Sequence, residues 1–353
     1  MSWPLLVSAA EASGDLLGAA LVRELLARRP AMHVCGLAGP ELRAAGALAI
    51  GRAEDLGVAG LVEVVPALPR VLSLRRRLQA ALNEGRPRVG VLIDAPDLHL
   101  RLHRAARSAG VRTVQLVAPQ FWAWRPGRAK TLGVLADRVL CLFRWEVEAL
   151  RAHGADAVWV GHPVLERVGA RRLGGRGRPR LALLPGSRSS ERARNLGAFL
   201  AAAEQVDVDV VVSAPTGTPV PDGGVVDARP GLEVLRDCDA ALVAPGTATL
   251  EATLLGVPTV CAGGLHPVSA WVARRLLATE HVALPNIILG RGAIPEVLQD
   301  LSVARLRTAL ESALKPASAE AAAPLAEELR DALGPPGFGA RAADAVLELG
   351  DAA

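Results

Sequence analysis

The chain alternates short apolar runs with longer segments that have a single apolar face, and this alternation starts again about halfway along. A short run that is apolar at nearly every position is typical of a parallel strand buried on both faces, and the segments between have helical periodicity. Strand, helix and strand in this order indicate a doubly wound α/β sheet. In the first half we expect strands at Leu5–Ala9, His33–Leu37, Val89–Ile93, Thr113–Val117, Arg138–Leu142 and Ala157–Val160.

A stretch rich in glycine, arginine and proline, Arg167–Arg180, interrupts the pattern and is typical of a linker. Beyond it we expect strands at Leu181–Leu184, Val208–Ser213, Ala240–Val243 and Thr259–Cys261. A chain of 353 residues is also long enough for two domains. We therefore predict two Rossmann-like parallel-sheet domains, the GT-B architecture, with an interdomain cleft at the carboxyl ends of the strands.

The expected domains can be given approximate boundaries. We assign residues 1–168 to the first domain and residues 169–316 to the second. The remaining residues, 317–353, have the pattern of two helices broken at Gly334-Pro335-Pro336-Gly337. We expect these helices to pack back on the first domain or on a partner subunit.

The composition limits the classes of protein to consider. Hydrophobic residues make up 51% and charged residues 22% of the chain, which is the profile of a globular protein. The net charge of +4 comes almost entirely from arginine, a pattern that a GC-rich genome would also produce. Arginine binds phosphate through a planar fork. Because the arginines are dispersed and no recognition motif is present, we do not expect nucleic-acid binding.

Cellular location is indicated by what the chain lacks. No apolar run reaches the roughly 18 residues that a spanning helix needs, and the apolar start of the chain reads as a strand. The four cysteines are far apart and form no CxxC pair, so we expect reduced thiols and no metal site. We therefore expect a cytoplasmic protein whose membrane contact is peripheral.

Two motifs in the first half carry polar groups directly after strands. In Glu11–Gly18, Gly14 permits close backbone approach at a helix start, where free N–H groups attract anions, although Ser13 or Asp15 could equally cap that helix. In Ile93-Asp94-Ala95-Pro96-Asp97, an acid follows a strand and Pro96 starts a helix. Asp94 is our candidate for a general base, because an inverting glycosyl transfer needs a group that deprotonates a sugar hydroxyl.

The next motif, Pro119–Arg125, gathers Phe121, Trp122 and Trp124 in a loop after a strand. It could fill the core at a domain face, or it could form a stacking wall with Arg125 and Arg128 nearby to bind phosphate.

The second half carries three further motifs. Leu181–Arg188 predicts a strand, a tight turn and a helix start, where N–H groups beyond Gly186 and the Arg188 guanidinium would cradle a diphosphate. Ala244–Glu251 repeats this arrangement. Thr247 could cap the helix there, and Glu251 lies on the same side, where it could accept both ribose hydroxyls. The third, Leu284-Pro285-Asn286, is a weaker signal.

Together these segments resemble the lipid-A-disaccharide synthases, a family of bacterial glycosyltransferases. The matching pieces occur in the family's order and extend from Ser8 to about Asp300. They are EASGDLLGA, GLAGPELRAAG, LGVAGLVEV, IDAPD, PQFWAWR, VGHPV, LLPGSR, GTATLEA and LPNIILGR.

The resemblance implies a GT-B enzyme that inverts the anomeric carbon without a metal or another cofactor. It implies UDP-2,3-diacylglucosamine as donor, 2,3-diacylglucosamine 1-phosphate as acceptor, and a β-1,6-linked disaccharide 1-phosphate and UDP as products. By matched position Asp94 would be catalytic. The donor would be bound by Gly186, Ser187, Arg188, Gly246, Thr247, Glu251 and Asn286. We assign the acceptor to Ser13, Gly14, Asp15, Trp122 and Arg125.

The resemblance also implies a homodimer with exchanged C-terminal segments and peripheral association with the inner membrane. Val64–Leu78 mixes apolar residues with four arginines, which suits an anionic bilayer surface, although an ordinary amphipathic helix is the alternative. The chain departs from the family pattern at Ala118 and at Ala262-Gly263-Gly264, which leaves donor contacts near residues 262–266 open.

Three other functions remain compatible with these motifs. A UDP-N-acetylglucosamine 2-epimerase or a transferase that forms lipid II would share the two domains and the UDP pocket. A non-catalytic nucleotide-binding regulator could retain the same fold.

Overall fold

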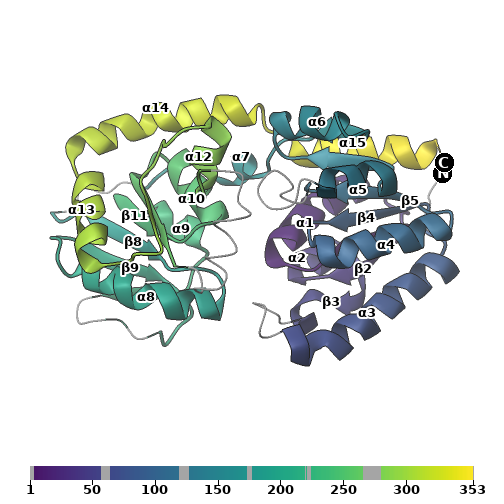
Figure 1. Cartoon of the computed structure of the whole chain (residues 1–353), viewed down its shortest axis with the longest axis horizontal. Coiled ribbons are helices and arrows are strands. Elements are labelled where there is room, and N and C mark those ends of the chain that lie inside the picture. The colour runs from purple at the N-terminus through teal and green to yellow at the C-terminus, as the bar shows by residue number, and fades with distance from the viewer. Residues whose placement is uncertain are drawn as a thin grey trace. The chain divides into compact units, whose positions relative to one another are not determined.

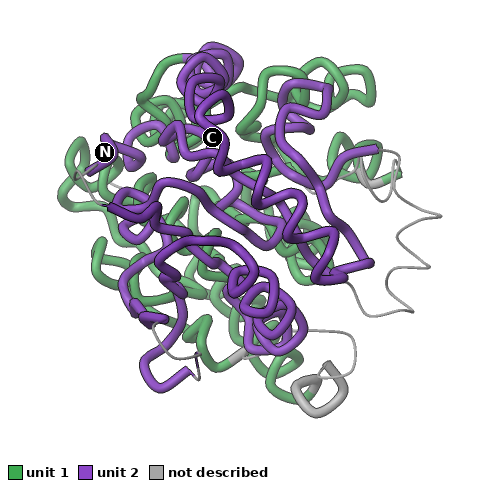
Figure 2. The backbone as a smooth tube through the Cα atoms, turned by 90° about the vertical axis from the view of Figure 1, so that its left-hand side faces the viewer, with its two compact units in different colours: residues 1–163, 335–353 green, residues 164–334 purple. Residues whose placement is uncertain are grey.

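The computed structural model describes residues 4–56, 64–118, 127–172, 177–218, 220, 224–264 and 280–352. The chain forms two compact units (Figure 2), one made of residues 1–163 and 335–353 and the other of residues 164–334. Each unit is a parallel sheet with helices on its faces (Figure 1).

The sheet of the first unit has the strand order β3-β2-β1-β4-β5-β6-β7, and all its pairs are parallel. The order reverses direction between β1 and β4, which makes their carboxyl ends the topological switch point where ligands bind in such sheets. The strands are β1 (Leu5–Ala9), β2 (Val34–Ala38), β3 (Leu48–Arg52), β4 (Val89–Ile93), β5 (Arg112–Leu116), β6 (Arg138–Cys141) and β7 (Ala157–Trp159).

The helices of this unit include one from the far end of the chain. That helix, α15, packs against α1, and Arg29, the residue directly after α1, binds Asp351 through Nη1–Oδ1 at 2.8 Å. The helical segments are α1 (Ala12–Arg28), α2 (Pro40–Ala44), the 3₁₀ turn η1 (Ala53–Leu56), α3 (Val64–Glu84), α4 (Pro96–Ser108), α5 (Gly127–Leu135), α6 (Arg144–Arg151) and α15 (Phe338–Asp351).

The second unit has the strand order β10-β9-β8-β11-β12-β13, again parallel throughout, with its switch point between β8 and β11. Its strands are β8 (Arg180–Leu184), β9 (Asp209–Ser213), β10 (Val225–Asp227), β11 (Ala240–Val243), β12 (Thr259–Gly263) and β13 (Glu296–Leu298). Its helices are α7 (Val164–Arg167), α8 (Ser189–Ala203), α9 (Gly231–Leu235), α10 (Thr247–Leu254), α12 (Leu284–Leu289), α13 (Val303–Ala313) and α14 (Pro316–Leu333).

The ten strands expected from the apolar runs are all present, with ends that differ by at most two residues. Three further strands, β3, β10 and β13, were not expected, and each lies at the edge of a sheet. Edge strands are partly open to solvent and need no continuous apolar run. Leu48 in β3 and Val225 in β10 are 69% and 54% exposed, which shows why the sequence signal is weak there.

The chain passes between the units at Pro163/Val164 and again at Gly334/Pro335, rather than after residue 168 and before residue 317. The first crossing lies earlier because the end of α7 and the next residue are bonded to the second unit. Arg236 donates to the carbonyls of Arg167 at 2.7 Å and Val168 at 3.1 Å. The two C-terminal helices belong to different units. Helix α14 packs on α10 and α12, whereas α15 belongs to the first unit.

Arg341 on α15 binds both segments of the first unit at which the chain passes to or from the second unit. Its guanidinium donates to the carbonyls of Val160 at 2.9 Å, Pro336 at 2.9 Å and Pro335 at 3.0 Å, and it lies 4.6 Å from the ring centre of Trp159. A single side chain therefore satisfies three carbonyls where the chain leaves and re-enters the unit.

Candidate functional site

Most of the residues predicted to act follow the strands that border the two switch points. In the first unit, Ser13-Gly14-Asp15 lies in the first turn of α1 after β1, and Asp94 follows β4 directly. In the second unit, Gly186-Ser187-Arg188 follows β8, and Gly246-Thr247 follows β11. Because β1 pairs with β4 and β8 with β11, the loops of each pair lie side by side at the edge where these folds bind ligands.

The turn that carries Asp94 has an unusual backbone. Asp94 has φ 51° and Ala95 has φ 43° and ψ 58°, so two successive residues other than glycine are left-handed. Such residues cost about 1 to 3 kcal/mol each and persist only where the surroundings hold them. The half-buried Asp94 donates its N–H to Leu116 at 2.9 Å, and its carbonyl accepts from the His99 ring at 2.7 Å. The turn is thus held on both sides of the aspartate Cα.

The acceptor residues proposed after β1 divide into an exposed group and a buried one. Ser13 is exposed in the first turn of α1, and Gly14 is buried against β4, where an added Cβ would lie 3.3 Å from Ile93 Cγ2. Asp15 is only 2% exposed. Its carboxylate accepts the N–H groups of Gly39 and Glu41, both at 2.8 Å, at the start of α2. A direct contact between Asp15 and a ligand would require the exchange of one of these bonds.

The turn after β8 presents backbone and arginine donors to solvent. Gly186 has φ 127°, and Ser187 and Arg188 are exposed at the start of α8. The Glu191 carboxylate accepts from the backbone N–H of Arg188 at 3.3 Å and pairs with its guanidinium at 3.4 Å. The buried Asn195 stabilises the turn, because its Nδ2 donates to the Pro185 carbonyl at 2.9 Å. The turn is therefore rigid while its charged group stays accessible to an anion.

The neighbouring turn after β11 is equally open. Gly246 has φ 149°, Thr247 is exposed, and a Cβ at Gly246 would meet nothing within 4 Å. At the end of β12, by contrast, a Cβ on Gly263 would lie 2.7 Å from the Pro245 ring. This close approach gives a packing reason for the small residue at one of the positions where the chain departs from the family pattern.

Glu251 lies inside α10 with 8% of its surface exposed. Burial raises the pKa of its carboxyl, and the positive charge of Arg167, whose Nη2 lies 3.5 Å from Oε1, offsets part of that effect. The site therefore holds an acid whose charged form gains from additional hydrogen-bond donors.

Asn286 occupies a different setting from the other donor candidates. It is 1% exposed, and its Nδ2 donates to the Ile294 carbonyl at 2.9 Å and to Glu296 Oε1 at 2.8 Å. Its Oδ1 accepts the N–H groups of Ala293 and Ile294, both at 2.8 Å. The amide thus makes four bonds within the protein, and its observed role is to shape the segment around α12.

Two candidates lie outside the described residues, namely Trp122 and Arg125; no side-chain placement is described for Arg128 either. Sequence reasoning missed several polar residues that support the turns. These residues are His99, His103, Gln115, Asn195 and Glu296. Two sequence signals could have indicated three of them, namely a glutamine within an apolar strand and two histidines four residues apart on one helix.

The turn after β8 generates a stability prediction. A Cβ on Gly186 would lie 2.5 Å from the Glu191 Cβ, at a φ that disfavours alanine, so we expect Gly186→Ala to destabilise the protein by about 1 to 3 kcal/mol. A Cβ on Gly197, within the helix α8 that follows this turn, would meet nothing within 4 Å, so Gly197→Ala should stabilise the protein by about 0.5 to 1 kcal/mol. Urea unfolding followed by circular dichroism measures both. Equal effects of the two substitutions would contradict the account of this turn.

The chain is similar to known proteins over nearly its whole length. Residues 5–214 and 226–326 match the family model described as lipid-A-disaccharide synthetase. Lipid-A-disaccharide synthases from Anaeromyxobacter sp. (strain K) and Myxococcus xanthus are 41% and 37% identical, and the alignments cover 97% and 98% of this chain and 96% and 97% of those proteins. Arabidopsis thaliana UGT89C1 complexed with UDP has a TM-score of 0.65 at 16% identity, covering 99% of this chain and all of that one.

The structural likeness confirms the GT-B fold, and the sequence matches separate the chain from the epimerase, the lipid II transferase and the non-catalytic regulator considered above. The chain belongs to the lipid-A-disaccharide synthase family and is a glycosyltransferase of lipid A synthesis.

Proposed function

We propose that this enzyme transfers 2,3-diacylglucosamine from UDP-2,3-diacylglucosamine to 2,3-diacylglucosamine 1-phosphate with inversion at the anomeric carbon. The products are a β-1,6-linked disaccharide 1-phosphate and UDP. The observation that carries the proposal is the division of chemistry between the two switch points. One carries a carboxylate on a backbone turn held in place, and the other carries an exposed arginine at a helix start.

In the proposed reaction the 6-hydroxyl oxygen of the acceptor attacks the anomeric carbon of the donor. A carbon–oxygen bond forms as the bond from that carbon to the β-phosphate oxygen breaks. The hydroxyl proton passes to the carboxylate of Asp94, which acts as general base. The electron pair of the broken bond stays on UDP. Attack opposite the leaving group inverts the anomeric centre.

Arg188 and the start of α8 suit the leaving diphosphate. Free N–H groups at a helix start attract anions, and the arginine adds a charge-assisted fork. The exposed guanidinium is paired with Glu191 at 3.4 Å, so it can swing to a ligand by exchanging a solvent-accessible partner. The open backbone at Gly246 and Thr247 would line the same pocket from the adjacent strand end.

Glu251 is the proposed partner of the two ribose hydroxyls of UDP. Burial disfavours its charged form, so two hydroxyl donors would stabilise the carboxylate that the protein itself stabilises only partly. Asp15 and Asn286 enter the proposal as supports for the acceptor and donor loops, because their polar atoms are engaged by backbone groups.

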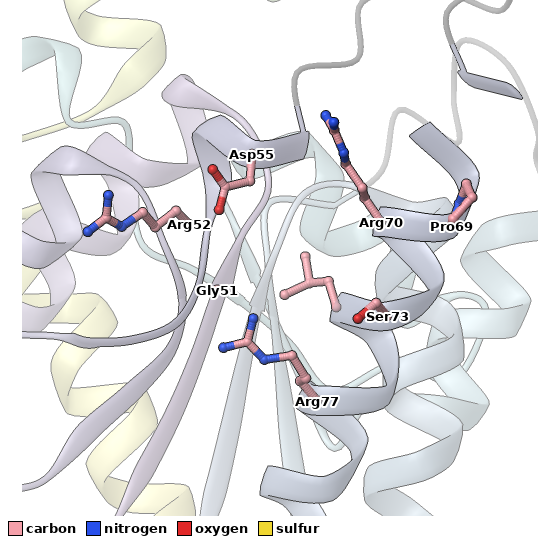
Figure 3. A pocket seen from close by; sticks show the side chains of 8 residues that line it. Gly51, Arg52, Asp55, Pro69, Arg70, Ser73 and Arg77 are labelled. Carbon is pink, nitrogen blue, oxygen red and sulfur yellow. The ribbon is translucent and has the colours of Figure 1, made fainter. Parts of the chain in front are cut away.

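The acyl chains of both substrates make a membrane surface part of the proposal. None of the helices in the described ranges is both long and apolar enough to cross a bilayer. A hollow of about 650 Å³ lies between β3, η1 and α3, and Figure 3 shows Arg70 and Arg77 projecting from α3 beside it. The lining residues are Gly51, Arg52, Asp55, Pro69, Arg70, Ser73, Leu74 and Arg77. We propose that this arginine-rich face contacts anionic lipid at the inner membrane.

The proposal includes a homodimer in which residues 335–353 are exchanged. Its support is the position of α15, which packs on α1 but is joined to the rest of the chain by the short segment after α14. A sedimentation experiment that finds only a monomer of 36.7 kDa would contradict the dimer.

The direct test is an assay with the diacyl UDP-sugar and the diacyl sugar phosphate that follows disaccharide formation. We expect Asp94→Asn to lower kcat at least 100-fold, because general-base catalysis contributes about 10²- to 10⁴-fold. Its UDP affinity, measured by calorimetry, should stay within twofold of the wild type. No product from wild-type enzyme that binds UDP would overturn the proposed function.

For Glu251→Gln we expect opposite effects on binding and stability. UDP affinity should fall about 10- to 100-fold, because hydrogen bonds to a charged group contribute about 1.5 to 3 kcal/mol. Since the folded state raises the pKa of this carboxyl, its charge opposes folding above that pKa, and the ligand-free variant should be at least as stable at pH 7.

Calorimetry and thermal unfolding measure both effects of Glu251→Gln, and Glu320→Gln on the exposed face of α14 is the matched control. The difference in UDP affinity between wild type and variant should narrow as the pH is lowered through the raised pKa of Glu251. An unchanged affinity at pH 7 would remove Glu251 from the donor site.

For the membrane face, the double variant Arg70→Gln with Arg77→Gln should lower binding to anionic vesicles about 10- to 30-fold, since each basic residue near such a surface contributes roughly 1 kcal/mol. Arg305→Gln with Arg307→Gln on α13 makes the same charge change in the other unit. Vesicle sedimentation compares the two. Equal losses would show that net charge, and not this face, determines binding.

A further inference from the structure

We infer that a chain of buried polar side chains beneath the Asp94 turn positions the general base, and that His99 and Gln115 are positioning residues of the reaction. The inference rests on the proposed role of Asp94. It concerns side chains that lie under the turn, within the core of the first unit. The chain consists of Ser8, His99, His103, Thr113 and Gln115, which are between 0% and 1% exposed.

The position of the proton on His99 follows from its partners. A backbone carbonyl can only accept, so Nδ1 carries the proton that is donated to the Asp94 carbonyl at 2.7 Å. Nε2 then accepts the Ser8 hydroxyl at 2.9 Å. Complete burial lowers the pKa of His99 to about 4, which keeps the ring neutral with one proton. His99 therefore joins β1 to the turn after β4, the two strands that border the switch point.

Gln115 approaches the same turn from β5. Its Nε2 donates to the carbonyls of Val117 at 3.0 Å and of Leu116 at 3.3 Å, and lies 3.4 Å from the Asp94 carbonyl. Val117 is itself left-handed, with φ 67°. Gln115 thus reaches carbonyls of both left-handed turns, one at the end of β4 and one at the end of β5.

His103 fixes the orientation of the Gln115 amide. Because Nε2 of Gln115 faces carbonyl groups, its Oε1 must accept, and the partner is Nε2–H of His103 at 2.9 Å. Nδ1 of His103 then accepts the Thr113 hydroxyl at 2.8 Å. His99 and His103 are four residues apart, so one face of α4 carries both rings. Both ring nitrogens of each histidine and both amide atoms of Gln115 therefore have partners inside the protein.

The consequence is geometric. The Asp94 carbonyl takes donors from two directions, which restricts the peptide plane after Asp94 and with it ψ of Asp94 and φ of Ala95. The bond from the Asp94 N–H to the Leu116 carbonyl restricts the peptide plane before it, so the residue is held in a left-handed conformation that L-residues rarely adopt. The direction of the Cα–Cβ bond follows from that backbone conformation, and so does the direction of the carboxylate. A displacement of about 1 Å can cost 10²-fold in rate. Loss of the series should therefore affect turnover more than substrate binding.

The test uses His99→Leu and Gln115→Met, which keep most of the side-chain volume and remove the hydrogen bonds. In the disaccharide assay we expect kcat to fall about 10- to 100-fold, with KM for both substrates and the UDP dissociation constant within about twofold of the wild type. His99→Asn places an amide donor near the position of Nδ1, and it should recover most of kcat.

A control separates positioning from general loss of stability. Leu25→Ala removes a fully buried side chain from α1 in the same unit, where it should cost about 2 to 5 kcal/mol. Its kcat, per folded molecule, should match the wild type. Unchanged kcat in His99→Leu and Gln115→Met, an equal fall in Leu25→Ala, or no recovery in His99→Asn would each overturn the inference. If the wild-type enzyme formed no disaccharide in this assay, that result would instead reject the proposed function.

Discussion

The turn that carries the proposed general base depends on the hydrogen bonds made to one backbone carbonyl, that of Asp94. Two successive left-handed residues end β4, and this conformation is unfavourable unless the surroundings hold it. A histidine ring and a glutamine amide supply donors to that carbonyl from inside an otherwise aliphatic core. The energetic cost of burying polar groups is offset only because each has a partner, so the turn and the buried series stabilise each other.

The two units share one strand order but carry different chemical groups at their switch points. In each sheet the first strand lies between the second and the fourth, and the third lies beyond the second. The loops with the candidate residues follow the first and fourth strands, where the strand order reverses. At the switch point of the first unit, a strained non-glycine turn presents a carboxylate. At that of the second, glycines with positive φ present backbone groups and an arginine. An acid suits a hydroxyl acceptor, and open N–H groups suit a diphosphate, so the difference matches the proposed division of substrates.

Much of this architecture could be predicted from the sequence because it depends on local pattern. Buried central strands need continuous apolar runs, and residues that follow such strands must lie at the carboxyl edge of a parallel sheet. That reasoning located Asp94, Gly186, Arg188 and Gly246. Edge strands such as β3 were missed because one side faces solvent and the pattern weakens.

The roles of some side chains could not be predicted because they depend on contacts between distant segments. Asp15 has the position of a helix cap on α1, yet its carboxylate binds the start of α2, more than twenty residues later. Asn286 reads as an isolated loop residue, but its four bonds close the segment up to Glu296. The pairing of Gln115 with the Asp94 turn likewise exists only once β4 and β5 have aligned.

The measurement that tests this account most directly is a crystal structure of the enzyme with UDP and the diacyl sugar phosphate bound together. The account predicts that the acceptor 6-hydroxyl lies about 2.6 to 3.2 Å from the Asp94 carboxylate, while the diphosphate rests on the turn at Gly186 and Arg188. It also predicts that Asp94 and Ala95 keep their left-handed conformation. An acceptor hydroxyl held by another base, with Asp94 turned away from it, would contradict the account.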